Sequence, residues 1–141
     1  YGKRKFLLCH EKRISIAQYP TRGIFIVMEL EKMSCNDCQA GSPSISEGET
    51  DNLLQHIPLW TRGVHELGDM LTRDFEFESF KDAFEFASKV ADLADEQNHH
   101  PKIVTEWGKV SVFWWTHTIS GLHINDFIMA AKTDLIAKSI E

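Results

Sequence analysis

Residues 79–98 carry the pattern that most restricts the fold of this chain, because apolar side chains recur there with the spacing of an α-helix. Ser79 opens the segment and Asp82 follows three residues later, which is typical of a helix N-terminus. The apolar face consists of Phe80, Ala83, Phe84, Ala87, Val90, Ala91 and Ala94. The pattern predicts an amphipathic helix that ends near Asn98 and buries one face against a core.

The segment before this helix alternates with a period of two, which is the spacing of a half-buried strand. One face consists of Leu71, Arg73, Phe75 and Phe77, and the other of Thr72, Asp74, Glu76 and Glu78. We expect an earlier strand through Trp60 and Val64 to pair with this one through a turn at Gly68-Asp69. The two strands would form a β-hairpin with one wet face.

A second hairpin is predicted after the helix. Pro101 is followed by the β-prone runs KIVTEW and VSVFWWTH, with a Gly108-Lys109 turn signal between them. Gly121 then breaks the chain, and we expect a last helix from about Ile124 to Ser139.

A short helix is predicted before the first hairpin. Ser46 and Glu49 have the spacing of a capping box, and Pro58 ends the helix that follows. The order is thus helix, two strands, helix, two strands, helix. Because tight turns join both strand pairs, we expect an α+β fold with a four-stranded antiparallel sheet and the helices packed on one face.

Charge divides the chain into two parts. Residues 1–27 carry six Lys or Arg side chains and one acidic one, whereas the rest carries nine basic and twenty acidic ones. The acidic part repels phosphate backbones, so we expect no nucleic-acid binding by the main body. The chain begins with Tyr1, and Met28 and Met33 are candidate starts. We expect residues 1–32 to be a basic segment that is poorly ordered or not native, and residues 33–141 to form one domain.

The apolar runs are short. The longest near the N-terminus is IFIVM at 24–28, which is far below the roughly 20 residues needed to cross a bilayer. We therefore expect a soluble, cytoplasmic protein without membrane contact. The basic residues of the segment 1–27 leave organellar targeting open.

The three cysteines are an odd count, which argues against a disulfide framework. Cys35-x-x-Cys38 has no second Cys or His pair with the usual spacing of a structural zinc site. No predicted βαβ unit surrounds the motif, as a thioredoxin-like site requires. We expect reduced thiols in an N-terminal loop.

Three histidines lie at the ends of the second predicted hairpin. His99 and His100 occupy the turn from helix to strand, and His117 ends the last strand. Because a hairpin folds back on itself, its outer ends at residues 101 and 117 must be neighbours, so the three imidazoles should converge. Asp126 is expected in the first turn of the last helix.

Such a cluster has three interpretations. Convergent histidines can act as acid and base in one step near neutral pH, with a carboxylate to orient one ring. They can also be polar turn residues with ordinary hydrogen bonds, and this alternative stays open here. Three His and one Asp could hold zinc, but adjacent histidines usually point apart, so a metal site is the least favoured interpretation.

Several motifs resemble the pterin-4a-carbinolamine dehydratase family. They are Phe75-x-Phe77, Ser79-Phe80, Asn98-His99-His100-Pro101, Trp115-Thr116-His117, Gly121-Leu122 and Asp126-Phe127. The similarity runs from about Met33 to about Ile136, and the segment CNDCQAGSPSISEGET resembles the N-terminal stretch of microbial members. Residues 1–27 match nothing associated with the family.

The resemblance implies a lyase that dehydrates 4a-hydroxytetrahydropterins to quinonoid dihydropterin, and so recycles the cofactor of aromatic amino-acid hydroxylases. It implies His99 and His117 as the acid/base pair and His100 as a pterin contact that assists proton transfer. Asp126 would orient or charge-stabilise His117. Further substrate contacts are implied for Asp95, Asn98, Trp60 and Thr116. For Trp60, an ordinary place in the core or in a strand is an equally favoured alternative. Neither a metal nor another cofactor would be required, because the reaction needs only proton transfers.

The chain departs from the family pattern at two positions. His123 stands where members often have Ser or Thr, so we expect a weaker side-chain cap on the last helix. Asn98 replaces an acid or a Gly. Neither change removes a proton-transfer group.

The resemblance also leaves other roles open. Animal members bind the dimerisation helix of a homeodomain transcription factor through the helix face that otherwise makes the family's tetramer. Phe80, Phe84 and Ala87 lie on such a helix here, but core packing against the sheet explains them equally well. A microbial subgroup is linked to molybdopterin metabolism. The complete histidine set favours the enzyme, and the resemblance implies a homodimer or homotetramer.

Overall fold

Four strands form one antiparallel sheet with β2 and β4 at its centre. The computed structural model describes residues 28–37 and 40–140 of the chain. The strands, in the order β1-β2-β4-β3 across the sheet, are β1 (Thr61–His65), β2 (Gly68–Glu76), β4 (Lys109–Trp114) and β3 (Lys102–Glu106). Each hairpin therefore contributes one central strand and one edge strand.

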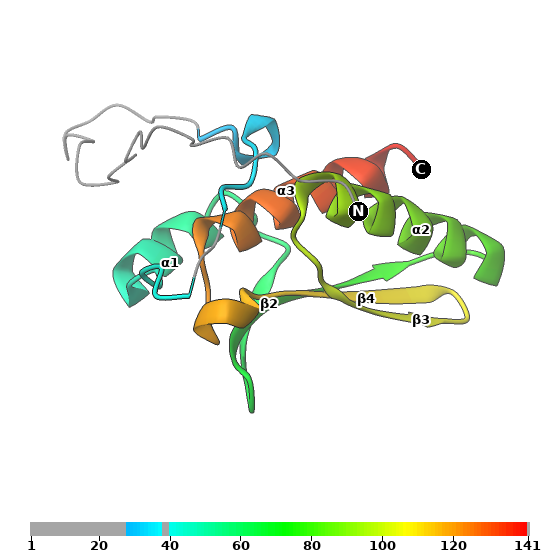
Figure 1. Cartoon of the computed structure of the whole chain (residues 1–141). Helices are drawn as coiled ribbons and strands as arrows, with labels where there is room; N and C mark the ends of the chain where they lie inside the picture. Colours follow the sequence, from blue (N-terminus) through cyan, green and yellow to red (C-terminus); the bar gives the residue numbers. More distant parts are fainter. Residues whose placement is uncertain (1–27, 38–39, 141) are drawn as a thin grey trace, which may run out of the picture.

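Helices cover one face of this sheet. The described residues form three α-helices and two short 3-10 helices: α1 (Glu47–Leu54), α2 (Phe80–Gln97), α3 (Ile124–Lys138), η2 (Leu30–Lys32) and η3 (His117–Ile119). α2 and α3 lie on the same face of the sheet (Figure 1). The predicted α+β class and the antiparallel sheet are confirmed. Within the described part of the chain, no helix has both the length and the apolar character that a membrane crossing needs.

The core lies between the sheet and these two helices. Phe86 of α2 packs on Phe75 of β2, with ring centroids 4.6 Å apart. Each large apolar side chain buried in this way contributes about 1.5–3 kcal/mol to the stability of the fold. Other buried members of the core are Leu71, Val90, Val110, Val112, Trp114, Phe127 and Ile128.

The buried face of α2 differs from the predicted one at its aromatic positions. Phe86, which the predicted apolar face left out, is fully buried, whereas Phe80 and Phe84 are 51% and 60% exposed. Ala83, Ala87 and Ala94 of the pattern are buried, and such small side chains let the helix approach the sheet closely. Ala91, also placed on the predicted apolar face, is exposed. Two phenylalanine rings are therefore left on the outer surface of the domain.

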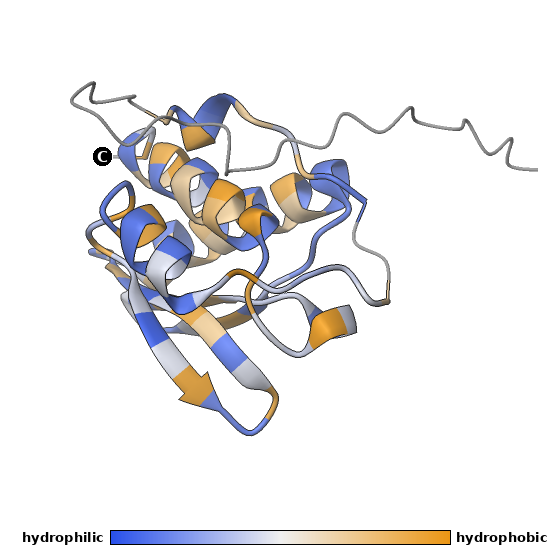
Figure 2. Ribbon diagram, turned by 90° about the vertical axis from the view of Figure 1, so that its left-hand side faces the viewer, coloured by the Kyte–Doolittle hydropathy of each residue, from blue (hydrophilic) through white to orange (hydrophobic). Residues whose placement is uncertain are grey.

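The two hairpin turns lie slightly before the positions predicted for them. His65 pairs with Gly68 and Glu106 pairs with Lys109, so the two-residue turns are Glu66-Leu67 and Trp107-Gly108. The glycine signals were nevertheless meaningful, because Gly68 and Gly108 have φ values of +105° and +69°, which disfavour other residues. The β1–β2 hairpin projects from the rest of the domain (Figure 2).

The ends of α2 determine where the histidines begin. Ser79 caps the N-terminus by accepting a hydrogen bond from the Asp82 amide. At the other end Asn98 adopts the left-handed conformation, with φ 50°, which Asn tolerates better than most residues. The chain leaves the helix there, and the His99 amide donates back to the Ala94 carbonyl. The predicted end of the helix near Asn98 is confirmed.

The packed domain begins before residue 33. Leu30 in η2 is 1% exposed and belongs to the core, and the Lys132 Nζ of α3 donates to the Glu31 carbonyl. The expected boundary therefore cut off a core residue. Residues 1–27 lie outside the described residues, so the expectation for them stays a prediction.

This boundary leads to a prediction about shortened chains. A chain that starts at Met28 should have the same free energy of unfolding as the longer chain, because it keeps Leu30. A chain that starts at Met33 should lose about 1.5–3 kcal/mol, the usual contribution of one buried leucine. Urea unfolding of the three chains measures the difference. Equal stability of the two shortened chains would show that η2 contributes nothing to the core.

Candidate active site

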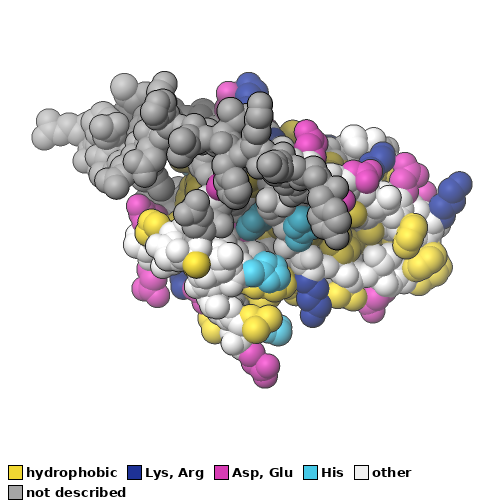
Figure 3. Space-filling model, in the orientation of Figure 1, with side chains coloured by type: hydrophobic (Ala, Val, Ile, Leu, Met, Phe, Trp, Pro, Cys, Tyr) yellow, Lys and Arg dark blue, Asp and Glu magenta, His cyan; other side chains and the backbone are white. Residues whose placement is uncertain are grey.

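The three predicted histidines meet around one cavity of about 400 Å³. His99 and His100 precede β3, His117 follows β4, and the pairing of these strands brings their ends together. Histidine side chains gather on the face shown in Figure 3. The cavity is lined by Asn36, Asp37, Gln97, Asn98, His99, His100, Thr116, His117, Thr118 and Asn125. The predicted convergence is confirmed.

A second cavity, of about 510 Å³, lies where the end of β2 meets the C-terminus of α3. Its wall includes Arg73, Glu76 and Glu78 and has no histidine. Arg73 is already engaged by Asp134, which also accepts a hydrogen bond from the Trp60 indole. We therefore place the candidate site in the smaller cavity, where groups that can transfer protons near neutral pH are gathered.

His99 is held rigidly by a buried carboxylate. Its Nε2 lies 2.6 Å from Asp126 Oδ1, and the two side chains are 8% and 0% exposed. The ring also stacks on Trp114, with centroids 5.7 Å apart and planes at 12°. Because an ionised carboxylate only accepts hydrogen bonds, Nε2 must carry a proton. Nδ1 is then the ring nitrogen that can exchange a proton with a ligand.

Asp126 is itself fixed by two further donors. Its Oδ2 accepts from the Thr116 hydroxyl at 2.9 Å and from the His123 amide at 2.8 Å. Such bonds stabilise a buried charge. Asp126 thus orients His99, whereas the resemblance implied that it would orient His117, and this implied role is corrected by the geometry. Thr116, an expected substrate contact, supports the carboxylate as well as lining the cavity.

His100 and His117 are more accessible than His99. His100 Nε2 lies 2.8 Å from Asp95 Oδ1, and both side chains are largely exposed. The His117 ring rests against Trp115, with centroids 4.3 Å apart, and its Nε2 lies 3.4 Å from the His100 carbonyl oxygen. The cavity therefore combines one rigid, buried imidazole with two that solvent or a ligand can reach.

The other expected substrate contacts divide into two groups. Asn98 lines the cavity directly, and Asp95 reaches it only through its bond to His100. Trp60 does not line this cavity. It is 3% exposed in the core, and its Nε1 donates to Asp134 Oδ1 at 2.8 Å. Trp60 is therefore a core residue and not an aromatic wall of the pocket. The sequence alone could not distinguish these two places.

Five lining residues were not predicted from the sequence. They are Asn36, Asp37, Gln97, Thr118 and Asn125. Gln97, Thr118 and Asn125 are adjacent in the sequence to predicted site residues, so that adjacency could have indicated them as lining residues. Asn36 and Asp37 lie about 60 residues before the histidines, and no local pattern connects two such segments.

No cysteine is among the described residues that line this cavity. Cys35 Sγ lies 4.0 Å from the Asn125 carbonyl, and Cys9 and Cys38 lie outside the described residues. Among residues 28–37 and 40–140, no group of three or more His, Cys, Asp or Glu side chains is arranged to hold a metal ion.

His123 caps α3 more completely than expected. Its Nδ1 accepts from the Asn125 amide at 3.3 Å, while its own amide donates to Asp126. The two residues therefore form a capping box. Burial lowers the pKa of His123 below its ordinary value, although the charge of Asp126 acts in the opposite direction.

This lowered pKa predicts a pH dependence of stability. Below its ordinary pKa of 6.5, His123 binds a proton more readily in the unfolded chain, so the free energy of unfolding should fall as the pH falls. Protonation of Nδ1 would also remove the helix cap. His123→Ser keeps an acceptor but does not titrate, so this variant should lose less stability between about pH 7 and about pH 5. Urea unfolding of both proteins at both pH values measures the difference, and identical losses would contradict the prediction.

The fold and the cavity together define a class of protein: an α+β domain with an aspartate-held histidine beside two accessible ones. Residues 43–136 match the family described as pterin 4 alpha carbinolamine dehydratase. A protein of Chlorobium luteolum named "Putative pterin-4-alpha-carbinolamine dehydratase" is 50% identical over 106 residues, 75% of this chain and 93% of the relative. The chain therefore belongs to the pterin 4 alpha carbinolamine dehydratase family.

A solved structure agrees with this membership. The crystal structure of a transcriptional coactivator/pterin dehydratase from Brucella melitensis matches with a TM-score of 0.62 and 29% sequence identity. The match covers 67% of this chain and 99% of that chain.

Proposed function

We propose that this protein dehydrates 4a-hydroxytetrahydropterins to quinonoid dihydropterin, as a lyase that recycles the pterin cofactor of aromatic amino-acid hydroxylation. The observation that carries the proposal is the buried His99–Asp126 pair, whose histidine lines the same cavity as the accessible His117. Family membership supports the substrate class.

The reaction needs two proton transfers, and the cavity offers a group for each. A base removes the proton from N5, the electrons of that N–H bond form the C4a=N5 double bond, and an acid protonates the departing C4a hydroxyl to give water. His99 fits the base, because Asp126 stabilises the imidazolium that forms when Nδ1 accepts a proton. His117 fits the acid, because its exposed ring can regain a proton from solvent. The reaction is redox-neutral, so these transfers complete it.

A spectroscopic assay with synthetic 4a-hydroxytetrahydrobiopterin tests the proposal. The purified protein should accelerate the dehydration over the spontaneous rate without added metal. Treatment with a chelator should leave the rate unchanged. Activity that disappears on chelation and returns only with zinc would replace the acid/base mechanism with a metal site, and no acceleration at all would refute the proposed function.

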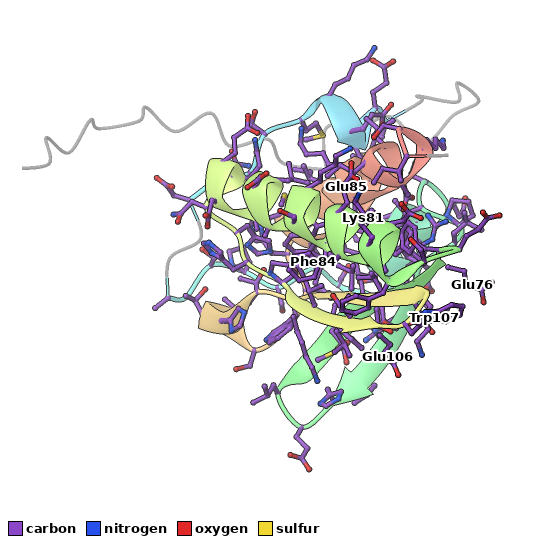
Figure 4. All side chains as sticks on the ribbon, turned by 90° about the vertical axis from the view of Figure 1, so that its right-hand side faces the viewer. Glu76, Lys81, Phe84, Glu85, Glu106 and Trp107 are labelled. Atoms are coloured by element: carbon purple, nitrogen blue, oxygen red, sulfur yellow. The ribbon has the colours of Figure 1, made fainter. Side chains whose placement is uncertain are left out.

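The exposed surface of α2 favours a second property, self-association. Phe80 and Phe84 lie on the outer side of the helix with ring centroids 6.2 Å apart, and Trp107 in the β3–β4 turn is 77% exposed. Figure 4 shows Phe84 and Trp107 on one side of the molecule, with Lys81 and Glu85 on the same helix as Phe84. Exposed aromatic groups of this size are typical of interaction surfaces. We propose a homodimer or homotetramer, with a protein partner at the same surface as the alternative.

Light scattering at micromolar concentration should therefore give a mass of two or four chains. Phe84→Glu places a charge in the proposed contact and should lower the mass without changing the circular dichroism spectrum. Leu135→Glu, at a half-exposed position of α3, is the matched control and should leave the mass unchanged. A clean monomer mass for the unaltered protein would contradict self-association and leave the surface to another partner.

A further inference from the structure

Residues 35–37 form no helix or strand, yet side chains hold them firmly. The Cys35 amide donates to Gln97 Oε1 at 3.0 Å. The Asn36 amide donates to Asn125 Oδ1 at 2.9 Å, and the Asn36 carbonyl accepts from Asn125 Nδ2 at 2.7 Å. The backbone groups of the segment thus find partners on two helices that carry the site.

Asn125 makes both bonds to one backbone residue, as a neighbouring strand would. Its side chain is 1% exposed, and a buried amide without partners would be costly. The amide is therefore complementary to the backbone of Asn36 in this one position. Asn125 also immediately precedes Asp126, so the same turn of α3 holds both the segment and His99.

The held segment supplies part of the cavity wall. Asn36 and Asp37 line the cavity together with His99 and His117, and both of these N-terminal residues are exposed towards solvent. They also precede residue 43, where the match to the family begins. The helices and the sheet therefore supply the histidines, whereas a separate segment adds polar acceptors beside them.

We propose that Asn125 is a positioning residue that holds Asn36 and Asp37 against the bound pterin, so that this wall determines how tightly the substrate binds. This inference rests on the proposed function. Among the described residues that line this cavity, Asp37 is the one carboxylate, and it is exposed. It can therefore accept hydrogen bonds from N–H and O–H groups such as those of a pterin. The wall acts in binding and leaves the proton transfers to the histidines.

Three variants of the full-length chain test the inference. Asn125→Ala removes the two hydrogen bonds to Asn36, and Asp37→Ala removes the carboxylate acceptor. Lys132→Met removes a hydrogen bond to Glu31, which precedes residues 35–37 and lies outside the cavity. The first two should raise KM roughly 5- to 10-fold, the equivalent of one ordinary hydrogen bond. Their kcat should stay within about twofold of that of the unaltered protein, because His99 and Asp126 are untouched. The pH profile of kcat should stay the same. Lys132→Met should leave KM unchanged.

Hydrogen exchange at the Asn36 amide gives a readout that does not depend on turnover. Exchange should be faster in Asn125→Ala than in the unaltered protein, and dihydrobiopterin should slow it in the unaltered protein only. Turnover with an unchanged KM in Asp37→Ala would overturn the inference, even if Asn125→Ala failed to fold. If Asn125→Ala exchanges faster but keeps its KM, the inference is also overturned, whereas the proposed function stands. If the unaltered protein neither binds dihydrobiopterin nor accelerates dehydration, both the inference and the proposed function are overturned.

Discussion

Replacing His99 or His117 with alanine should lower kcat by roughly 10²–10⁴-fold, the usual contribution of a positioned acid or base. The two losses have different physical origins. His99 is fixed by Asp126 and Trp114, so its removal takes away a preorganised proton acceptor. His117 is exposed, so its removal opens the cavity to water, which can replace a proton donor in part. We therefore expect the His99 variant to be the slower of the two.

The double variant distinguishes cooperation from independent effects. Groups that act in one step are not additive, so losing both histidines should cost much less than the product of the single losses. His100→Ala should act mainly on KM, because its ring is held by the exposed Asp95 at the cavity edge. His65→Ala, at the end of β1 and outside the cavity, is the control and should keep full activity. Single variants that fold and retain near-normal rates would show that these imidazoles are ordinary turn residues.

Asp126→Ala should be the most destabilising single change at the site. Three donors converge on this fully buried carboxylate, from His99, Thr116 and the His123 amide. Removing it leaves all three donors without their acceptor, and each buried donor left unsatisfied typically costs about 1–3 kcal/mol. Urea unfolding measures the loss. A change below about 1 kcal/mol would mean that water replaces the carboxylate, as it does for exposed pairs.

Asp126→Asn separates stability from catalysis at the same position. The amide has the same shape and keeps an oxygen for Thr116 and the His123 amide, so we expect a much smaller loss of stability. Its N–H₂ group would donate to His99 Nε2, which moves the ring proton to Nδ1, so that neither ring nitrogen is left free to accept a proton. The rate should therefore fall about as far as in His99→Ala. An Asn variant that is stable and fully active would rule out a role for this carboxylate in setting the ring proton.

Long, strongly periodic segments were predictable from the sequence. The period of α2, its cap at Ser79 and its end at Asn98 follow from side chains within a few residues of one another. The alternation in β2 likewise reports which side chains face the core. Even there, local pattern could not decide which aromatic of α2 would be buried. Phe86 takes the core position and Phe84 remains exposed, because the packing of the helix on the sheet determines its exact rotation.

The convergence of His99, His100 and His117 also followed from the sequence, because a hairpin constrains both of its ends. The partners of these rings did not. Asp126 was expected beside His117, and it lies beside His99, because a side chain on α3 can meet either end of the hairpin until the helix is docked. Trp60 shows the same limit, since the side chain of a tryptophan just before a strand can turn into the core or into a cavity.

The sequence by itself thus determined the elements, their order and the residues able to transfer protons, since these depend on local spacing and on side-chain chemistry. Only the tertiary structure decided which carboxylate holds which imidazole and that residues 36 and 37 close one wall of the cavity. The pairing of Asn125 with Asn36 joins residues 89 positions apart, through two hydrogen bonds that exist only after α3 has packed. Hydrogen bonds of this kind have no periodic signature, because their geometry is set by the packing of whole elements rather than by neighbours along the chain.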